Sequence, residues 1–155
     1  MFVYSVRAST VKFFAVIVLT IGILVGAIAI GNSGAVVASA SGNINFGNIK
    51  TNDDRLEFIS QFGIEVTGEP KESVTFSVPE NFDKIISGYN ELQKSQGLDI
   101  SKYKNKKVTR YTYEIDGYGD YDGPVNVNLI IYRNTVVACD VSSADPTGFI
   151  EPLIK

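Results

Sequence analysis

An unbroken apolar stretch near the N-terminus is the first feature of this chain. Phe13 to Ile30 is FFAVIVLTIGILVGAIAI, without a single charged residue. At about 1.5 Å per residue, a helix over this stretch extends about 27 Å, close to the thickness of a bilayer core. The pattern predicts a transmembrane helix over residues 13–30, with the lipid bilayer as its partner.

Basic residues lie on one side of this stretch. Arg7 and Lys12 precede it, and the next basic residue is Lys50. Because positive charges favour the cytoplasmic side, residues 1–12 are predicted to be cytoplasmic and the C-terminal part extracytoplasmic. We therefore expect a single-pass protein of the cell membrane.

A cleaved secretory signal is the alternative interpretation of the same stretch. Ala38-Ser39-Ala40 offers a small-residue cleavage site. The apolar stretch is longer than the roughly 7–15 residues of a signal peptide, which favours an uncleaved anchor.

The segment after the anchor has the composition of a flexible linker. No charged residue occurs from Gly31 to Asn48, where Gly, Ser and Asn are frequent. Such a composition cannot bury a core. We expect a linker over residues 31–49 and one extracytoplasmic domain over residues 50–155.

Helical spacing of apolar residues predicts two helices in this domain. Leu56, Ile59 and Phe62 recur at helical spacing, which predicts a helix over about residues 53–62. A second helix is predicted from Pro79, a residue favoured at the first helical position, to a stop at Gly97. Its apolar stripe comprises Phe82, Ile85, Ile86, Tyr89 and Leu92.

Runs of β-branched and aromatic residues predict the strands. Residues 64–67 and 73–78 flank a turn-forming segment and predict a short hairpin. Residues 106–116, 125–132 and 135–141 predict a three-stranded antiparallel meander.

Alternation in the middle strand predicts how the helices pack. Val125, Val127, Leu129 and Ile131 alternate with polar residues along its first half, so one face is expected to be buried and the other solvated. We expect an α+β fold in which both helices pack on one sheet face and the second helix contacts these four residues.

Several segments of the domain resemble a known family. They are Asp54-Arg55-Leu56-Glu57-Phe58, Val78-Pro79-Glu80-Asn81-Phe82-Asp83, Tyr89-Asn90-Glu91-Leu92-Gln93 and Arg110-Tyr111-Thr112-Tyr113. Over about residues 53–150 the chain is similar to a family of uncharacterised domains from clostridial-type Gram-positive bacteria. The resemblance implies a domain behind one transmembrane segment, and it brings no catalytic residue.

Composition excludes several kinds of chemistry. The chain has no His and one Cys, Cys139, so His-based triads, His-containing zinc sites and an internal disulfide are impossible. Cys139 lies in a predicted strand and is expected to be buried and inert. With 17 acidic against 14 basic residues, the chain is not expected to bind nucleic acid, and no cofactor is expected.

Two short motifs have both a chemical and a plain interpretation. Ser101 and Lys104 match the S-x-x-K pairing of penicillin-recognising enzymes, but S-D-N and K-T-G are missing, so a polar loop is favoured. Asp116, Asp120 and Asp122 are weak candidates for a divalent-metal loop, although Asp and Gly also favour an ordinary turn.

Binding residues are predicted where basic and aromatic residues concentrate. The candidates are Tyr111, Tyr113, Lys104, Lys106 and Lys107. Tyrosines are good contact residues, and Tyr111 and Tyr113 share one strand face. The alternatives are sheet packing for the tyrosines and a solvated loop for the lysines.

These features favour a non-catalytic binding or interaction module at the bacterial cell envelope. Its partner would be an envelope polymer, a peptide or a protein. The alternative is a small envelope hydrolase that uses carboxylates, which needs a cleft lined by at least two acidic side chains with perturbed pKa values.

Overall fold

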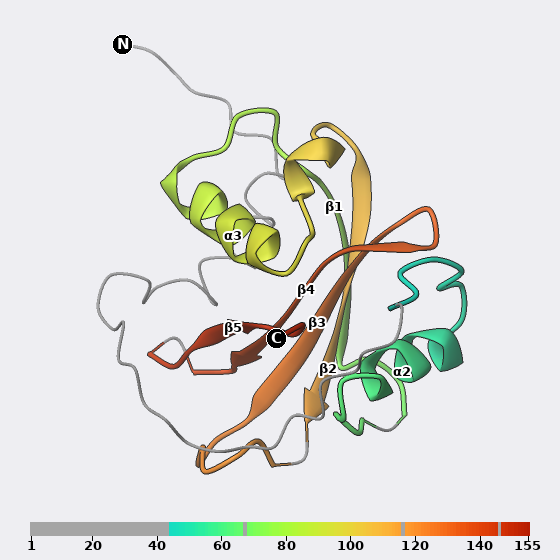
Figure 1. Ribbon diagram of the computed structural model, residues 1–155, viewed down its shortest axis with the longest axis vertical. Coiled ribbons are helices and arrows are strands. Elements are labelled where there is room, and N and C mark those ends of the chain that lie inside the picture. Colours follow the sequence, from blue (N-terminus) through green and yellow to red (C-terminus); the bar gives the residue numbers. More distant parts are fainter. Residues whose placement is uncertain (1–43, 67, 116, 146) are drawn as a thin grey trace.

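The computed structural model describes residues 44–155 except 67, 116 and 146. A five-stranded antiparallel sheet forms the centre, with strands in chain order across it (Figure 1). The strands are β1 (Glu72–Ser77), β2 (Lys107–Ile115), β3 (Val125–Tyr132), β4 (Thr135–Ser143) and β5 (Ile150–Pro152).

The predicted anchor, residues 13–30, lies outside the described residues, as does the linker up to residue 43. In the part that the structure describes, no helix has both the length and the apolar character needed to cross a bilayer.

Helix α2 (Asn52–Ser60) begins with a reciprocal cap. The Thr51 hydroxyl accepts a hydrogen bond from the Asp54 amide at 3.2 Å, and the Asp54 carboxylate accepts one from the Thr51 amide at 2.7 Å. Such caps satisfy backbone donors that the first helical turn leaves free. The helix then buries Phe58 and Ile59 against one face of the sheet.

Helix α3 (Lys84–Ser95) begins after Asp83, whose carboxylate accepts a hydrogen bond from the Ile86 amide at 2.8 Å. It buries Ile86 and Tyr89 in a second cluster that includes Val108 and Ile130 of the sheet. The short 3-10 helix η1 (Ile100–Tyr103) follows.

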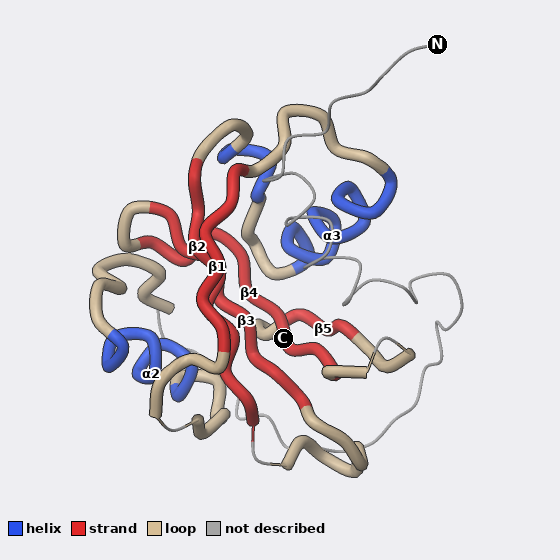
Figure 2. The backbone as a smooth tube through the Cα atoms, turned by 180° about the vertical axis from the view of Figure 1, so that it is seen from behind, coloured by secondary structure: helices blue, strands red, loops and turns tan. Residues whose placement is uncertain are grey.

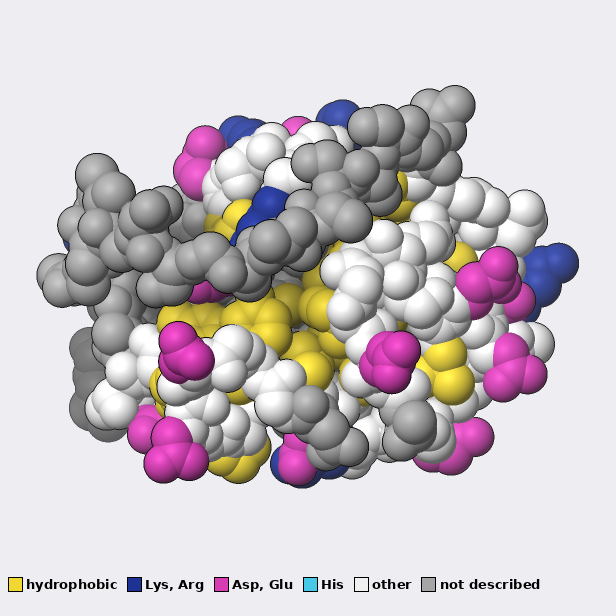
Figure 3. Space-filling view, turned by 60° about the horizontal axis from the view of Figure 1, so that its bottom comes forward, with side chains coloured by type: hydrophobic (Ala, Val, Ile, Leu, Met, Phe, Trp, Pro, Cys, Tyr) yellow, Lys and Arg dark blue, Asp and Glu magenta, His cyan; other side chains and the backbone are white. Residues whose placement is uncertain are grey.

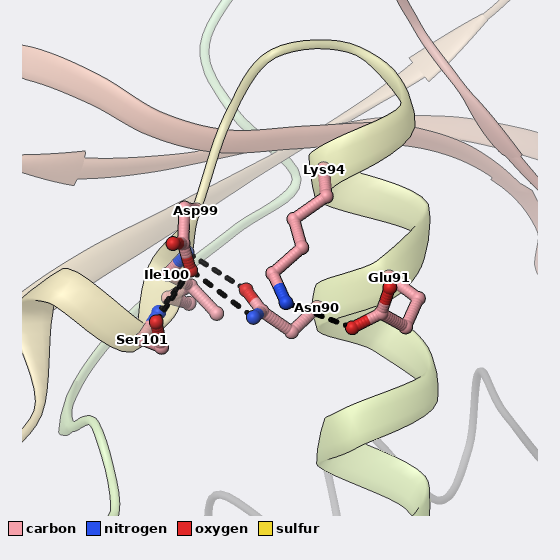
Figure 4. Close-up of polar contacts among 6 residues, drawn as sticks. All are labelled: Asn90, Glu91, Lys94, Asp99, Ile100 and Ser101. Carbon is pink, nitrogen blue, oxygen red and sulfur yellow. Dashed lines mark hydrogen bonds and ion pairs between the residues drawn. The ribbon is translucent and has the colours of Figure 1, made fainter.

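Asn90 of α3 holds the start of η1 in place (Figure 4). Its side-chain amide donates to the Asp99 carboxylate at 3.1 Å, and its carbonyl oxygen accepts from the Ile100 amide at 2.9 Å. The Ser101 amide and hydroxyl also donate to Asp99, at 3.0 and 2.6 Å. Helix α3 and η1 are thereby fixed to one another by a single carboxylate and a single amide.

The two helices lie on opposite faces of the sheet, as Figure 2 shows from behind. Val125, Val127, Leu129 and Ile131 cluster with the apolar residues of α2, whereas Ile130 clusters with those of α3. The expected α+β arrangement, a three-stranded meander with both helices on one face, is therefore wrong, as is the expected contact of the second helix with these four residues. The physical reason is that Leu129-Ile130-Ile131 is apolar on both faces, and each face needs its own cover.

Other boundaries also differ from the prediction. Residues 64–66 form no strand, so the predicted hairpin is absent, and β1 instead pairs with β2 from Glu72↔Thr112 to Ser77↔Lys107. The second helix begins at Lys84 rather than Pro79, and β5 was not predicted.

A buried polar network lies under α3, where the sequence predicted solvated positions. The Tyr89 hydroxyl donates to Asp140 at 2.9 Å, and the Asn128 amide donates to the same carboxylate at 2.8 Å. Thr112 in turn donates to Asn128 at 2.8 Å. Polar side chains on this face are therefore interior residues that satisfy one another.

The first described residues pack on the domain. The Val136 amide donates to the Phe46 carbonyl at 2.8 Å, and the Ile49 amide donates to the Asn134 carbonyl at 2.9 Å. Ile49 is buried in the α2-side core, and the Phe46 ring lies 5.8 Å from that of Phe58. The chain therefore joins the domain beside the turn between β3 and β4.

Candidate anion-binding pocket

A pocket of about 190 Å³ lies on the α2 side of the sheet, next to the β3–β4 turn. Its lining combines basic side chains, hydroxyl groups and a few apolar surfaces. The lining residues are Ile49, Lys50, Arg55, Lys107, Thr109, Tyr111, Ile131, Arg133 and Asn134.

Three local features bring these residues together. Lys107, Thr109 and Tyr111 alternate along β2, so their side chains share one face of the strand. Arg133 and Asn134 form the two-residue turn between β3 and β4, with φ of 46° and 66°. Such positive values match the turn type that two-residue hairpins favour.

Arg55 is the best-fixed side chain of the pocket. It lies on the buried side of α2 and keeps 8% of its surface exposed. Its Nε donates to the Tyr113 hydroxyl at 2.7 Å, and the guanidinium carbon lies 4.0 Å from the centre of the Tyr111 ring. The Tyr113 hydroxyl in turn donates a hydrogen bond to the side-chain oxygen of Asn52 at 2.7 Å. The guanidinium is therefore held between two tyrosines in one orientation.

The charged side chains of the pocket are all basic. Lys50, Arg55, Lys107 and Arg133 line it, and no Asp or Glu among the described residues does. Among the described residues none of the four forms an ion pair; the ion pairs are Lys71–Glu114, Lys94–Glu91, Arg110–Glu72 and Lys155–Glu151. Lys50, Lys107 and Arg133 are exposed, and only Arg55 is buried. A buried charge is usually paired, because an isolated one loses its hydration without compensation.

The carboxylate of Asp54, one residue before Arg55, is already occupied. Asp54 accepts hydrogen bonds from the Lys50 and Thr51 amides at 2.8 and 2.7 Å. The Thr51 and Lys50 backbone bonds lower the pKa of Asp54. This carboxylate caps α2, and it does not line the pocket.

The predicted binding residues separate into three groups. Lys107 and Tyr111 line the pocket. Tyr113 is 1% exposed and does not line the pocket, but its hydroxyl accepts the hydrogen bond that positions Arg55. Lys104 and Lys106 are exposed and do not line it.

Sequence reasoning missed Lys50, Arg55 and Arg133 as members of the pocket. Arg55 carried a signal, because it lies three and four positions before Phe58 and Ile59 and thus on the apolar side of the helix. Lys50 and Arg133 carried none, since only the folded sheet brings their distant segments together.

The predicted metal loop has no support in the part that is described. Asp116 lies outside the described residues, and Asp120 and Asp122 are exposed. Among residues 44–155, without 67, 116 and 146, no group of three Asp, Glu or Cys side chains is placed to hold a metal ion.

Ser101 and Lys104 contact different partners. The Ser101 hydroxyl donates to Asp99, whereas the Lys104 ammonium lies 4.9 Å from the centre of the Phe82 ring. The Ser–Lys activation that the motif would need is therefore not among the contacts of these residues.

The shifted carboxylates have structural roles. Hydrogen bonds from Ser101 lower the pKa of Asp99, and those from Thr147 lower the pKa of Asp145. Asp140 is different, because burial raises its pKa to about 6. It is enclosed under α3 and does not line the pocket.

The family model described as "Domain of unknown function (DUF4830)" matches residues 58–141, more than half of the chain. The chain belongs to the DUF4830 family. The match extends from the end of α2 into β4, so this DUF4830 domain includes the pocket residues of β2 and of the β3–β4 turn. No curated protein sequence and no solved structure matches the chain.

Proposed function

We propose that this protein is a non-catalytic binding module of the cell envelope, tethered through residues 13–30, and that the basic pocket takes an anionic ligand. The tether and the extracytoplasmic location rest on the apolar stretch and on the basic residues before it. The ligand class rests on the charge of the pocket.

The main support for this proposal is that Arg55 is buried among neutral partners. Arg55 is 8% exposed, and within the described residues its guanidinium contacts only neutral partners, two tyrosines and Asn52. An oxyanion in the pocket would supply the missing negative charge. Hydrogen bonds to charged groups contribute about 1.5–3 kcal/mol each, enough for measurable binding by one arginine with neighbouring lysines.

The carboxylate hydrolase is less well supported. Catalysis by carboxylates needs two acidic groups with perturbed pKa values beside one cleft. The lowered pKa values belong to caps and turns, and the raised one belongs to the enclosed Asp140. In the part of the chain that the structure describes, no acidic residue lines the basic pocket.

The test is lysine footprinting of the full chain in neutral detergent. An amine-reactive reagent labels the lysines, and mass spectrometry gives a rate for each. Inorganic tripolyphosphate, compared with chloride at equal ionic strength, should slow the labelling of Lys50 and Lys107 at least about threefold. Lys102, Lys104 and Lys106 lie close by in the sequence and should keep their rates, which makes them internal controls.

A pair of variants separates the pocket from general charge. Arg133→Asn removes one pocket cation and keeps a residue that tolerates positive φ. Loss of about 1 kcal/mol of binding energy corresponds to a roughly fivefold weaker affinity. Lys106→Gln removes the same charge outside the pocket and should change affinity less than twofold. Equal effects of the two variants, or no protection of Lys50 and Lys107, would contradict the proposal.

A further inference from the structure

We infer that the pocket binds the phosphate group of an anionic lipid in the membrane that anchors the chain. This inference rests on the proposed function and names the ligand. It follows from the size of the pocket, from the place where the chain joins the domain, and from the distribution of charge.

The pocket suits one small charged group. Sites for drug-sized ligands usually have about 300–1,000 Å³, whereas this pocket has about 190 Å³. Arg55 offers a planar donor group, and its Nη1 makes no hydrogen bond within the described residues. Guanidinium groups bind phosphate oxygens in pairs, and lysine ammonium groups bind them as point charges. Lys50 and Lys107 provide such ammonium groups at the same pocket.

The lining also accommodates the parts of a lipid next to its phosphate. The Thr109 hydroxyl, which already forms a hydrogen bond with the Thr75 hydroxyl at 2.9 Å, is a neutral polar group of the lining, and Ile49 and Ile131 are its apolar residues. A free inorganic phosphate would use only the polar part of this lining.

The chain joins the domain beside the pocket. Residues 46–49 bond to β4 and to the turn that carries Arg133 and Asn134, and Ile49 and Lys50 are themselves lining residues. The beginning of the described chain and the β3–β4 turn lie on the same side in Figure 1. Residues 31–43 can extend at most about 45 Å. A bilayer anchor at residues 13–30 therefore attaches to the pocket end of the domain.

Charge favours the same orientation. Figure 3 shows the face at the bottom of Figure 1, where acidic side chains lie around an area of apolar side chains. The loops between β2 and β3 and between β4 and β5 contribute the exposed Asp120, Asp122 and Asp145. An anionic membrane attracts each nearby Lys or Arg with about 1 kcal/mol and repels acidic groups. The four cations at the pocket are therefore attracted to such a surface, and the exposed Asp53 and Glu57 of α2 oppose part of this attraction.

The test uses the full chain reconstituted in lipid nanodiscs. One set contains phosphatidylcholine alone and a second contains about one third phosphatidylglycerol. A third set contains phosphatidylcholine with inorganic phosphate added. Lysine footprinting should show at least about threefold slower labelling of Lys50 and Lys107 in the phosphatidylglycerol discs than in phosphatidylcholine alone.

Matched triple variants distinguish a site from surface attraction. Lys50→Gln with Lys107→Gln and Arg133→Asn removes three pocket cations. Lys102→Gln with Lys104→Gln and Lys106→Gln removes three exposed cations elsewhere. Phosphatidylglycerol retained by the chain after transfer to neutral detergent, counted by mass spectrometry, should fall at least fivefold in the first variant and less than twofold in the second.

The outcomes separate the two proposals. Protection by inorganic phosphate without protection by phosphatidylglycerol would overturn the lipid inference and leave the anion-binding function standing. Absence of protection in both sets would overturn both. Equal protection of Lys102, Lys104 and Lys106 in the phosphatidylglycerol discs would reduce the effect to surface charge and overturn the inference. Failure of the chain to enter any nanodisc would overturn the lipid inference, because residues 13–30 would then not anchor the chain in a bilayer.

Discussion

Asp140 shows what a single buried charge does in this domain. It is 3% exposed, and Tyr89 and Asn128 donate hydrogen bonds to its two carboxylate oxygens. Burial raises its pKa to about 6 from an ordinary value of 3.8, although these hydrogen bonds and the charge of Arg110 oppose the shift. The network is therefore satisfied in its hydrogen bonds but unfavourable in charge at neutral pH.

The stability of the domain should consequently depend on pH in a defined direction. Because the pKa of Asp140 is higher in the folded than in the unfolded state, the folded protein binds the proton more tightly, and stability rises as the pH falls from about 7 to about 4. A shift of about two units corresponds to roughly 2–3 kcal/mol. Urea unfolding of the full chain in neutral detergent at several pH values measures this slope.

Two variants check that Asp140 causes the slope. Asp140→Asn should remove most of it, whatever the variant does to absolute stability. Tyr89→Phe removes a hydrogen bond that lowers the pKa of Asp140, so the slope should extend to higher pH. The pH range stays near or above 4, since Asp54, Asp99 and Asp145 have lowered pKa values and their contribution is lost only at lower pH. An unchanged slope in Asp140→Asn would contradict this account.

Individual pocket residues show how far sequence reasoning could go. Tyr111 and Lys107 were predicted from local concentration of aromatic and basic residues, and both line the pocket. The same reasoning selected Lys104 and Lys106, which do not line it. Composition cannot distinguish neighbouring lysines. Lys107 lies on the α2 face because it is in β2 and alternates in phase with Tyr113 and Ile115, which belong to the core on that face.

Helix α3 owes its end to one glycine. The Gly97 amide donates to the Lys94 carbonyl and the Leu98 amide to the Gln93 carbonyl, both at 3.0 Å, with Gly97 at a φ of 82°. This is the pattern of a Schellman cap, in which a left-handed residue closes the last turn. Gly88, by contrast, lies inside the helix, and apart from its chain neighbours and the backbone of α3 no described atom lies within 4 Å of the place a Cβ would occupy.

The same substitution at the two glycines should therefore have opposite effects. Gly88→Ala should raise the free energy of unfolding by about 0.5–1 kcal/mol, because alanine restricts the unfolded chain and favours the helix. Gly97→Ala should lower it by about 1–2 kcal/mol, because a side chain disfavours the left-handed conformation. Urea midpoints at unchanged slope are the measurement. A change of the same sign in both variants would mean that α3 does not end where the structure places it.

The strands show which parts of the fold could be predicted from short sequence segments. The predicted residues 125–132 coincide with β3, and the other two meander strands differ from β2 and β4 by one or two residues at an end. These elements follow from β-branched runs bounded by turns. The partner of β1 was mispredicted, because pairing between residues 30 to 40 positions apart depends on the whole sheet rather than on the adjacent turn.

At the scale of the whole molecule, the two faces of the sheet differ in the side chains that cover them. The α3 face is closed by an apolar cluster and the Asp140 network, so it contributes stability. The α2 face carries an apolar core and, next to it, the basic pocket. Polar residues on the α3 face were interpreted as solvated, since a sequence does not show whether a polar position faces water or another buried polar group.

The buried thiol provides a way to test the predicted membrane topology. Cys139 is fully buried and burial raises its pKa, so it should not react with maleimides in the folded protein. A cysteine introduced at the exposed Ser87 of α3 would then be the reactive group of the domain. If residues 13–30 span the membrane with residues 1–12 inside, Ser87→Cys should react with a membrane-impermeant maleimide in intact, wall-stripped cells.

Ser5→Cys is the matched reporter for the other side. It lies in the predicted cytoplasmic segment, so it should react only after lysis, whereas unsubstituted protein should remain unlabelled in both conditions. The reverse pattern would invert the orientation that Arg7 and Lys12 predict, and it would place the pocket against the inner leaflet. Labelled Ser87→Cys protein released into the medium would show that the apolar segment is removed. The lipid inference depends on this geometry, because only a retained anchor keeps the basic pocket within reach of a membrane.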